Sequence, residues 1–177
     1  MKIALTGAHG VGKTTILYNL EHPNKLQELA RKYLIKDKKP SDMTDKERRV
    51  FQYKYWDLLE KTEDNHNDFI SDRSLIDVLA YQLDIDSVFE VYARLIKLLS
   101  RYDILFYIPI EFPLVVDDVR SPEIEYQLLI DMRIRSLLNI FQESHDDIVR
   151  IYTIKGTVSQ RINAINKEIA TAITNGK

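Results

Sequence analysis

The sequence contains no cysteine in its 177 residues. This absence excludes disulfides, thiolate zinc sites and a cysteine nucleophile. The four histidines (His9, His22, His66, His145) are scattered and lack metal-ligand spacing. No apolar run approaches the length of a membrane span, and the first residues, M-K-I-A-L-T-G, lack the apolar stretch of a signal peptide. We therefore expect a cytoplasmic protein that does not associate with membranes.

Neither sign of charge dominates the sequence. It has 25 Lys and Arg against 27 Asp and Glu, a formal net charge of -2, which gives no reason to expect a globally basic surface that coats DNA. A local basic groove stays open. The sequence also lacks internal repeats, low-complexity tracts and Pro/Gly/Ser-rich linkers. A chain of this length without linkers predicts a single domain over residues 1–177.

Short apolar runs alternate with longer periodic segments along the chain. The apolar runs predict strands at residues 2–6, 69–72, 103–110 and 147–154. The periodic segments predict helices at 13–20, 26–34, from about 44 to 64, and at 75–83, 87–100, 122–143 and 158–173. This alternation predicts an α/β fold, a three-layer α/β/α sandwich with a parallel sheet. Ligands of such sheets bind at the carboxyl ends of the strands.

One motif lies where the first strand meets the first helix. Residues 7–14, G-A-H-G-V-G-K-T, match G-x-x-x-x-G-K-[ST] without a mismatch, which predicts the phosphate-binding loop of a P-loop NTPase fold. Lys13 should reach the β- and γ-phosphates of ATP, and the Thr14 hydroxyl should ligate Mg²⁺. His9 lines the loop through its backbone, and Thr15 continues the helix. The expected nucleotide-binding residues of the loop are Gly7, Ala8, His9, Gly10, Val11, Gly12, Lys13, Thr14 and Thr15.

The second strand ends on an acid followed by a base, Asp72 and Arg73. A GTPase should carry D-x-x-G and N-K-x-D, and a motor ATPase should end this strand in Asp-Glu; none of these occurs. The pair suits a kinase instead. Asp72 would ligate Mg²⁺ through water or take a proton from an acceptor hydroxyl, while Arg73 would hold substrate or phosphate. The structural alternative is that Asp72 caps a helix and the pair is otherwise a surface ion pair.

Four stretches together resemble a known family: residues 7–15, 27–34, 69–81 and 117–127, with a weaker fifth at 154–162. The chain is similar to the AAA_28-type small P-loop family that includes the nicotinamide-riboside kinase domain. It resembles thymidylate and deoxynucleoside kinases more distantly. The first and third stretches are specific in combination, whereas the second and fifth carry little weight alone. The resemblance implies a nucleoside- or nucleotide-kinase-like fold.

The resemblance also implies roles on the acceptor side. Glu28 and Arg31, in E-x-x-R, would face the acceptor pocket, although an exposed helix pair explains them equally well. Asp72 would be the catalytic acid/base or would organise Mg²⁺, and Arg73 would position substrate. Asp77 would support the Asp72–Arg73 loop from the following helix.

A lid and an adenine site are implied as well. A lid at about residues 111–135 would bring Arg120 to the transferring phosphoryl group, and Gly156 and Arg161 would border the adenine. The sequence departs from the family pattern in three places. Residues 21–24 leave little room for a strand before E-x-x-R, Val119 stands where a lid glycine is expected, and residues 128–129 are leucines rather than basic. Arg133 or Arg135 could substitute, but at most one of them.

Three aromatic residues lie in the long helix: Tyr53, Tyr55 and Trp56. An aromatic side chain can stack a nucleobase, which makes Tyr55 a candidate for substrate binding. Their helical spacing is also that of core residues, and core packing is the commoner explanation.

The leading hypothesis is an ATP- and Mg²⁺-dependent kinase that acts on a nucleoside- or nucleotide-like small molecule. A kinase acting on DNA or RNA is a rival that would use a basic groove, which Lys36, Lys38, Lys39, Arg48 and Arg49 could supply. A regulatory NTP-binding module with slow hydrolysis is a third reading. The sequence leaves the acceptor, the choice between ATP and other NTPs, and homodimer formation open.

Overall fold

A single parallel sheet organises the computed structural model, which describes residues 1–29, 43–82, 93–95, 97–98, 101–112, 124–145 and 149–176. The sheet has five strands in the order β2-β3-β1-β4-β5. All four pairings are parallel. The strand bounds are β1 Lys2–Thr6, β2 Lys25–Leu26, β3 Phe69–Asp72, β4 Ile104–Tyr107 and β5 Arg150–Thr153.

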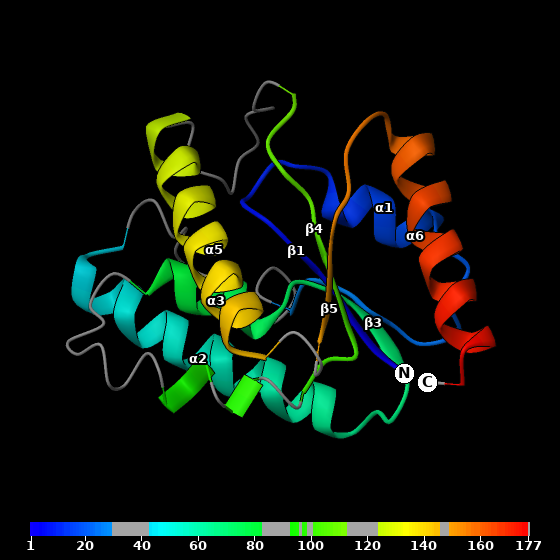
Figure 1. Ribbon diagram of the computed structural model, residues 1–177. Coiled ribbons are helices and arrows are strands. Elements are labelled where there is room, and N and C mark those ends of the chain that lie inside the picture. Colours follow the sequence, from blue (N-terminus) through cyan, green and yellow to red (C-terminus); the bar gives the residue numbers. More distant parts are fainter. Residues whose placement is uncertain are drawn as a thin grey trace.

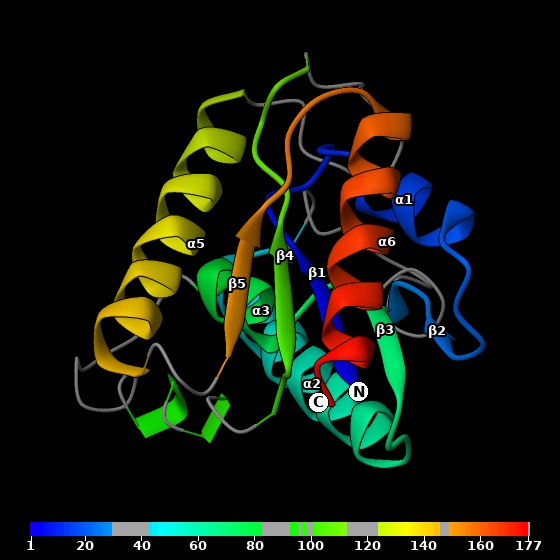
Figure 2. The same cartoon turned by 45° about the vertical axis from the view of Figure 1, so that its right-hand side comes forward.

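Helices cover both faces of this sheet (Figures 1 and 2). Helices α1 and α6 pack together on one side, and α2, α3 and α5 lie on the other. None of the helices in the described ranges is both long and apolar enough to cross a membrane. The predicted three-layer α/β/α sandwich is confirmed. The helix bounds are α1 Lys13–Asn19, α2 Asp45–Asp64, α3 Leu75–Tyr81, α5 Ile124–His145 and α6 Val158–Thr174.

Local sequence explains where several elements begin. Helices α2, α3 and α6 each start with a capping box, in which the cap residue (Thr44, Ser74 or Thr157) and the residue three positions later exchange hydrogen bonds. Strands β3 and β4 are buried along their whole length, because helices cover both faces of the sheet.

The second strand corrects one expectation. Residues 21–24 were expected to leave little room for a strand before E-x-x-R, with a helix from about residue 26. Instead Lys25 and Leu26 form β2, which pairs with Ile70 and Ser71 of β3. Two residues are too few to show periodicity, so their pairing partner decides their conformation. Most of the helix expected at 26–34, and much of that expected at 87–100, lies outside the described residues.

Register places the ends of three strands side by side. Leu5 of β1 is opposite Asp72 of β3, and Thr6 of β1 is opposite Tyr107 of β4. The predicted strand at 103–110 is shorter in the structure, ending at Tyr107, and the last begins at Arg150 rather than 147. The carboxyl edge of the sheet therefore brings the P-loop and the Asp72–Arg73 pair together.

Candidate active site

The P-loop turns sharply out of β1 and into α1. Gly7, Gly10 and Gly12 all have positive φ, and Gly12 is the residue before α1. A side chain at Gly7 would also collide with the backbone, since a Cβ there would lie 2.5 Å from the carbonyl oxygen of Ile108. Glycine is therefore required at position 7 by both conformation and space.

Gly7→Ala is expected to destabilise the fold by roughly 2–4 kcal/mol, because it adds a backbone collision to a strained φ. Thermal or denaturant unfolding measures the change. Gly176→Ala is the matched control, because Gly176 has φ 76 but nothing within 4 Å of its added Cβ. Equal losses of unfolding free energy in the two variants would show that the collision with the Ile108 carbonyl adds nothing to the effect of Gly7→Ala.

Lys13 lies folded against its own loop. Its Nζ donates hydrogen bonds to the carbonyl oxygens of Gly7, at 2.6 Å, and Ala8, at 2.7 Å. The side chain is buried, and this burial lowers the pKa of Lys13 to about 8. The ammonium is thus held inside the loop by neutral acceptors in a poorly solvated place, where an anionic partner would bind it more strongly.

Thr14 and Asp72 meet beside Lys13. The Thr14 hydroxyl donates to Oδ2 of Asp72 at 2.5 Å, and Asp72 is almost fully buried. Burial raises the pKa of Asp72, an effect that the nearby Lys13 ammonium opposes. A hydroxyl and a carboxylate are hard oxygen ligands of the kind Mg²⁺ takes alongside phosphate oxygens. Within the described residues no cluster of three or more His, Cys, Asp or Glu side chains could hold a metal alone.

Arg73 is held between an acid and an aromatic ring. Its Nη2 lies 2.9 Å from Oε1 of Glu28, and its Nε donates to the same oxygen at 3.1 Å. Both side chains are only 12% exposed. The guanidinium also lies 5.2 Å from the centre of the Tyr81 ring. This is a positioned, largely desolvated pair, so the alternative of a surface ion pair does not describe Arg73.

The backbone of Arg73 is unusual. It is the only described residue other than glycine with positive φ, 126°. Such strain persists where the surroundings fix it, and it concentrates at functional sites. Its carbonyl accepts a hydrogen bond from Ser71 Oγ at 2.6 Å, and the next residue, Ser74, donates its N–H to Asp77.

Asp77 and Tyr81 connect α3 to the P-loop. Asp77 Oδ1 accepts from the N–H of Gly7 at 2.8 Å, while its other oxygen caps α3. The Tyr81 hydroxyl accepts from the N–H of His9 at 3.1 Å and lies 2.9 Å from its Nδ1. Asp77 therefore binds the backbone just after the Asp72–Arg73 pair, as expected, and it also binds the first residue of the P-loop.

Tyr55 lies buried beside the same groups. Its side chain packs 6.5 Å, centre to centre, from the Phe51 ring. Burial raises the pKa of Tyr55 well above its usual value, an effect that the nearby Arg73 opposes. The hydroxyl is buried and makes no hydrogen bond within the described chain. A buried hydroxyl without a hydrogen-bond partner costs folding free energy. A polar group of a bound substrate that hydrogen-bonded to it would remove this cost.

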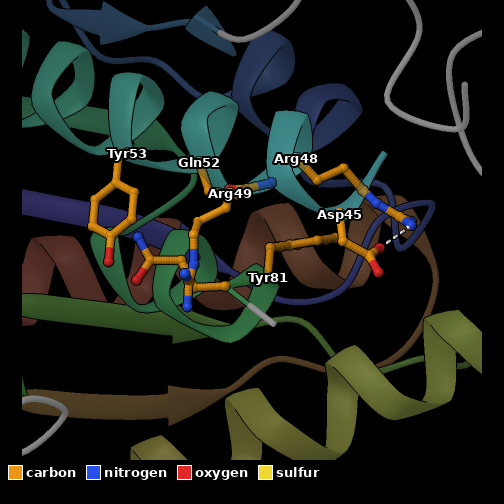
Figure 3. Close-up of a pocket in the computed structure, with 7 residues that line it drawn as sticks. Asp45, Arg48, Arg49, Gln52, Tyr53 and Tyr81 are labelled. Carbon is orange, nitrogen blue, oxygen red and sulfur yellow. Dashed lines mark hydrogen bonds and ion pairs between the residues drawn. The ribbon is translucent and has the colours of Figure 1, made fainter. Parts of the chain in front are cut away.

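A pocket opens between α2 and α3, next to Tyr81 (Figure 3). Three polar atoms of its side chains are buried and have no hydrogen-bond partner in the part of the chain that is described: Arg48 Nε, Gln52 Oε1 and Gln82 Nε2. Neither glutamine belongs to a recognisable motif in the sequence. We call this the α2/α3 pocket, and its lining residues are Asp45, Arg48, Arg49, Gln52, Tyr53, Tyr81 and Gln82.

Tyr53 and Trp56, the other two aromatic candidates of the long helix, contact Arg94. The guanidinium of Arg94 lies 5.2 Å from the ring centre of Tyr53 and 5.7 Å from that of Trp56. Arg94 also donates to Oε1 of Gln82 at 2.5 Å, which leaves the amide nitrogen of Gln82 as the group without a partner. Tyr53 and Trp56 thus pack on Arg94, whereas Tyr55 faces the interior.

Arg161 supports the P-loop from α6. It is almost completely buried, donates to the carbonyl oxygen of Val11 at 2.7 Å and pairs with Glu111 at 2.8 Å. Glu111 also accepts the N–H of Gly156 at 2.7 Å. Arg161 and Gly156 are therefore connected through one carboxylate at the edge of the loop.

The two arginines considered for the lid, Arg133 and Arg135, have different surroundings in the structure. Arg133 donates to the carbonyl oxygen of Ala80 at 3.3 Å, at the end of α3, whereas Arg135 is exposed and pairs with Asp131 on its own helix. Arg31 and Arg120 lie outside the described residues, as do Lys36, Lys38 and Lys39.

A parallel α/β/α sandwich with a P-loop at the carboxyl edge of its sheet defines the class of P-loop nucleotide-binding folds. Within that class, the chain belongs to the AAA_28 family, an AAA domain whose model matches residues 2–161. The expected resemblance is confirmed. A search of the curated proteins found no significant match.

Two kinases are among the solved structures similar to this chain. Deoxyadenosine kinase from M. mycoides, with the products dCMP and a flexible dCDP bound, gives a TM-score of 0.57 at 18% identity, covering 97% of this chain and 100% of that one. Shikimate kinase from Acinetobacter baumannii, in complex with shikimate, gives 0.51 at 17%, covering 98% and 93%. The chain therefore has the fold of small P-loop kinases, as predicted.

Proposed function

We propose that this protein is a kinase that transfers the γ-phosphate of ATP to a hydroxyl of a nucleoside-like small molecule. The observation that carries the proposal is the arrangement at one sheet edge: Lys13 and Thr14 of the P-loop meet Asp72, and the next residue, Arg73, is paired with Glu28. Phosphate-binding groups thus adjoin a charged pair suited to a second substrate. The two similar kinases are named for small acceptors, deoxyadenosine and shikimate.

In the proposed reaction each group has one task. Lys13 and the P-loop amides bind the β- and γ-phosphates, and Thr14 and Asp72 hold Mg²⁺, directly or through water. Bound Mg²⁺ would supply charge that neutralises the phosphate oxygens. Gly156 and Arg161 border the adenine. Arg120, from a lid at about residues 111–135 of the single domain, closes over the transferring group.

The acceptor binds on the side of Arg73 and Glu28. Its hydroxyl oxygen attacks the γ-phosphorus while the bond to ADP breaks, and its proton passes to the Glu28 carboxylate. Arg73 orients the acceptor and stabilises charge. Arg31 and the Tyr55 hydroxyl line this side, and the α2/α3 pocket receives the rest of the molecule. Asp72 is assigned to Mg²⁺ because its carboxylate already faces Thr14.

The test is ATP turnover with a panel of acceptors: nucleosides, nucleotides, nicotinamide riboside, a hydroxy acid, and single- and double-stranded DNA. Lys13→Ala serves as the blank. We expect one class of small acceptor to raise turnover far above the rate with ATP alone. Stimulation by DNA only would favour the nucleic-acid kinase, and slow unstimulated hydrolysis throughout would favour a regulatory module; either result would contradict the proposal.

A further inference from the structure

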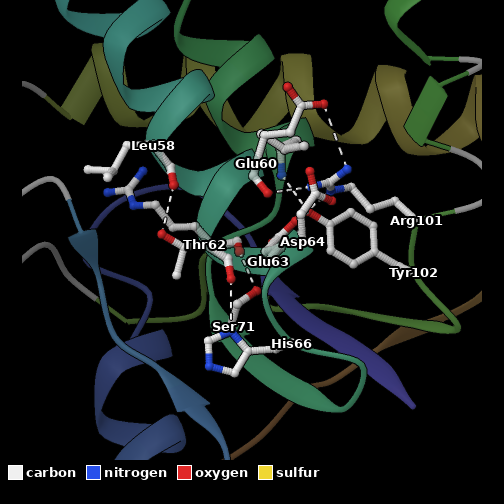
Figure 4. A network of polar contacts seen from close by, with 11 residues as sticks. Leu58, Glu60, Thr62, Glu63, Asp64, His66, Ser71, Arg101 and Tyr102 are labelled. Carbon is white, nitrogen blue, oxygen red and sulfur yellow. Dashed lines mark hydrogen bonds and ion pairs between the residues drawn. The ribbon is translucent and has the colours of Figure 1, made fainter.

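A buried carboxylate, that of Glu63, lies near the end of α2 (Figure 4). Glu63 is 1% exposed and accepts hydrogen bonds from Arg101 Nε at 2.7 Å and from the Tyr102 hydroxyl at 3.0 Å. Burial raises the pKa of Glu63 to about 7, an effect that Arg101 opposes. Arg101 also reaches Asp64, which lies at the protein surface. Burying such a group costs free energy that apolar packing would not, so stability alone is a weak explanation for it.

The network ends on the first residue of α3. The hydroxyl of Tyr102, itself buried, accepts the N–H of Leu75 at 2.9 Å while donating to Glu63. The Tyr102 hydroxyl thus acts both as a hydrogen-bond donor and as an acceptor. Leu75 comes two residues after Arg73, so the Glu63–Tyr102 pair fixes the backbone just beyond the strained residue.

Three hydrogen bonds to backbone groups hold this strained turn, and the Ser74 hydroxyl also donates to Thr6 Oγ1 of β1 at 3.2 Å. Ser71 binds the carbonyl of Arg73, Asp77 binds the N–H of Ser74, and Tyr102 binds the N–H of Leu75. The first two come from within a few residues of the turn. Tyr102 comes from the segment before β4, and it links the turn to Glu63 of α2. The turn is therefore bound in part by a residue that does not line the α2/α3 pocket.

We propose that Tyr102 and Glu63 are positioning residues for phosphoryl transfer, which hold the first turn of α3 so that Arg73 faces Glu28 across the acceptor side. This inference rests on the proposed kinase function. Neither residue contacts the reacting groups. Lys13 and Thr14 belong to α1, and Asp77 keeps its own hydrogen bond to Gly7 of the P-loop, so the network should affect the catalytic step and acceptor binding far more than ATP binding.

Tyr102→Phe tests this inference, since it removes the hydroxyl and keeps the ring. We expect kcat to fall about tenfold or more, while KM for ATP changes less than about twofold. Glu63→Gln should retain most of kcat, because its amide oxygen can still accept from Tyr102, whereas Glu63→Leu should resemble Tyr102→Phe. Activity retained in Glu63→Gln but lost in Glu63→Leu would show that Glu63 acts by holding Tyr102 in position rather than by its charge.

Tyr107→Phe is the matched control. It also removes a buried hydrogen bond from tyrosine to a carboxylate, the 2.6 Å contact with Asp131, but it does not touch α3. We expect a similar loss of unfolding free energy with little change in kcat. Equal kcat in Tyr102→Phe and Tyr107→Phe would overturn the positioning role alone. A wild-type protein that phosphorylates no acceptor would overturn the kinase proposal and this inference together.

Discussion

Lys13→Ala is expected to lower turnover by about a hundredfold to a thousandfold. The reason is the position of the ammonium, which lies inside the P-loop and binds the carbonyls of Gly7 and Ala8. Removing it takes away the one lysine that this loop offers to the phosphates. ATP affinity and kcat should both fall, because the charge acts on bound ATP and on the transition state.

The matched control is Lys167→Ala on α6, which removes an exposed lysine. It should leave turnover and ATP affinity unchanged. Initial-rate kinetics and direct measurement of ATP binding check both variants. Substantial turnover in Lys13→Ala would mean that the phosphates are held without this lysine, and the P-loop assignment would then be wrong.

The pH dependence of ATP binding gives a second readout of Lys13. Its pKa is about 8, lowered by burial, and phosphate favours the charged form. Below pH 8 the ammonium is already charged, so affinity should vary little. Above pH 8 binding must take up a proton, so Kd should rise toward tenfold per pH unit. This dependence should disappear in Lys13→Ala.

Local sequence was sufficient for the P-loop and most of the elements. The motif between β1 and α1 determines its own conformation, because its glycines and the helix start are adjacent. Asp72–Arg73 was likewise found at the end of a buried strand. Capping boxes at Thr44, Ser74 and Thr157 fix where three helices begin. Such features depend on neighbours within about four residues, so a pattern along the chain can predict them.

Long-range contacts escaped prediction for the opposite reason. Asp77 binds Gly7 across 70 residues, and Arg161 binds Val11 across 150. Whether Glu28 pairs with Arg73 depends on β2, whose two residues have no pattern of their own. Gln82 follows the last residue of a helix and looks unremarkable in sequence, yet its amide nitrogen is buried and has no hydrogen-bond partner among the described residues. Tertiary packing alone decides these outcomes.

Packing also separates the two acids that sequence alone could not assign. Asp72 was left open between acid/base work and Mg²⁺, and Glu28 was an acceptor-side candidate. In the structure Asp72 binds Thr14 while Glu28 binds Arg73, so the carboxylates face different partners. We therefore expect their amide variants to fail in different ways.

Asp72→Asn is expected to lower kcat by about a hundredfold and to raise the Mg²⁺ concentration needed for half-maximal rate by about tenfold or more. The amide keeps an oxygen for the Thr14 hydroxyl, so the fold should survive. It loses the negative charge that attracts the cation. Turnover measured over a Mg²⁺ series at saturating ATP checks both effects.

Glu28→Gln is the comparison. It should also lower kcat by about a hundredfold, because the amide cannot accept the proton of the acceptor hydroxyl. Its Mg²⁺ requirement should stay that of the wild type, since Glu28 faces Arg73 rather than Thr14. An Asp72→Asn variant with normal Mg²⁺ dependence, beside a Glu28→Gln variant that needs more Mg²⁺, would reverse the two roles. Because each carboxylate is buried with a different partner, the Mg²⁺ series distinguishes them even though both variants lose similar activity.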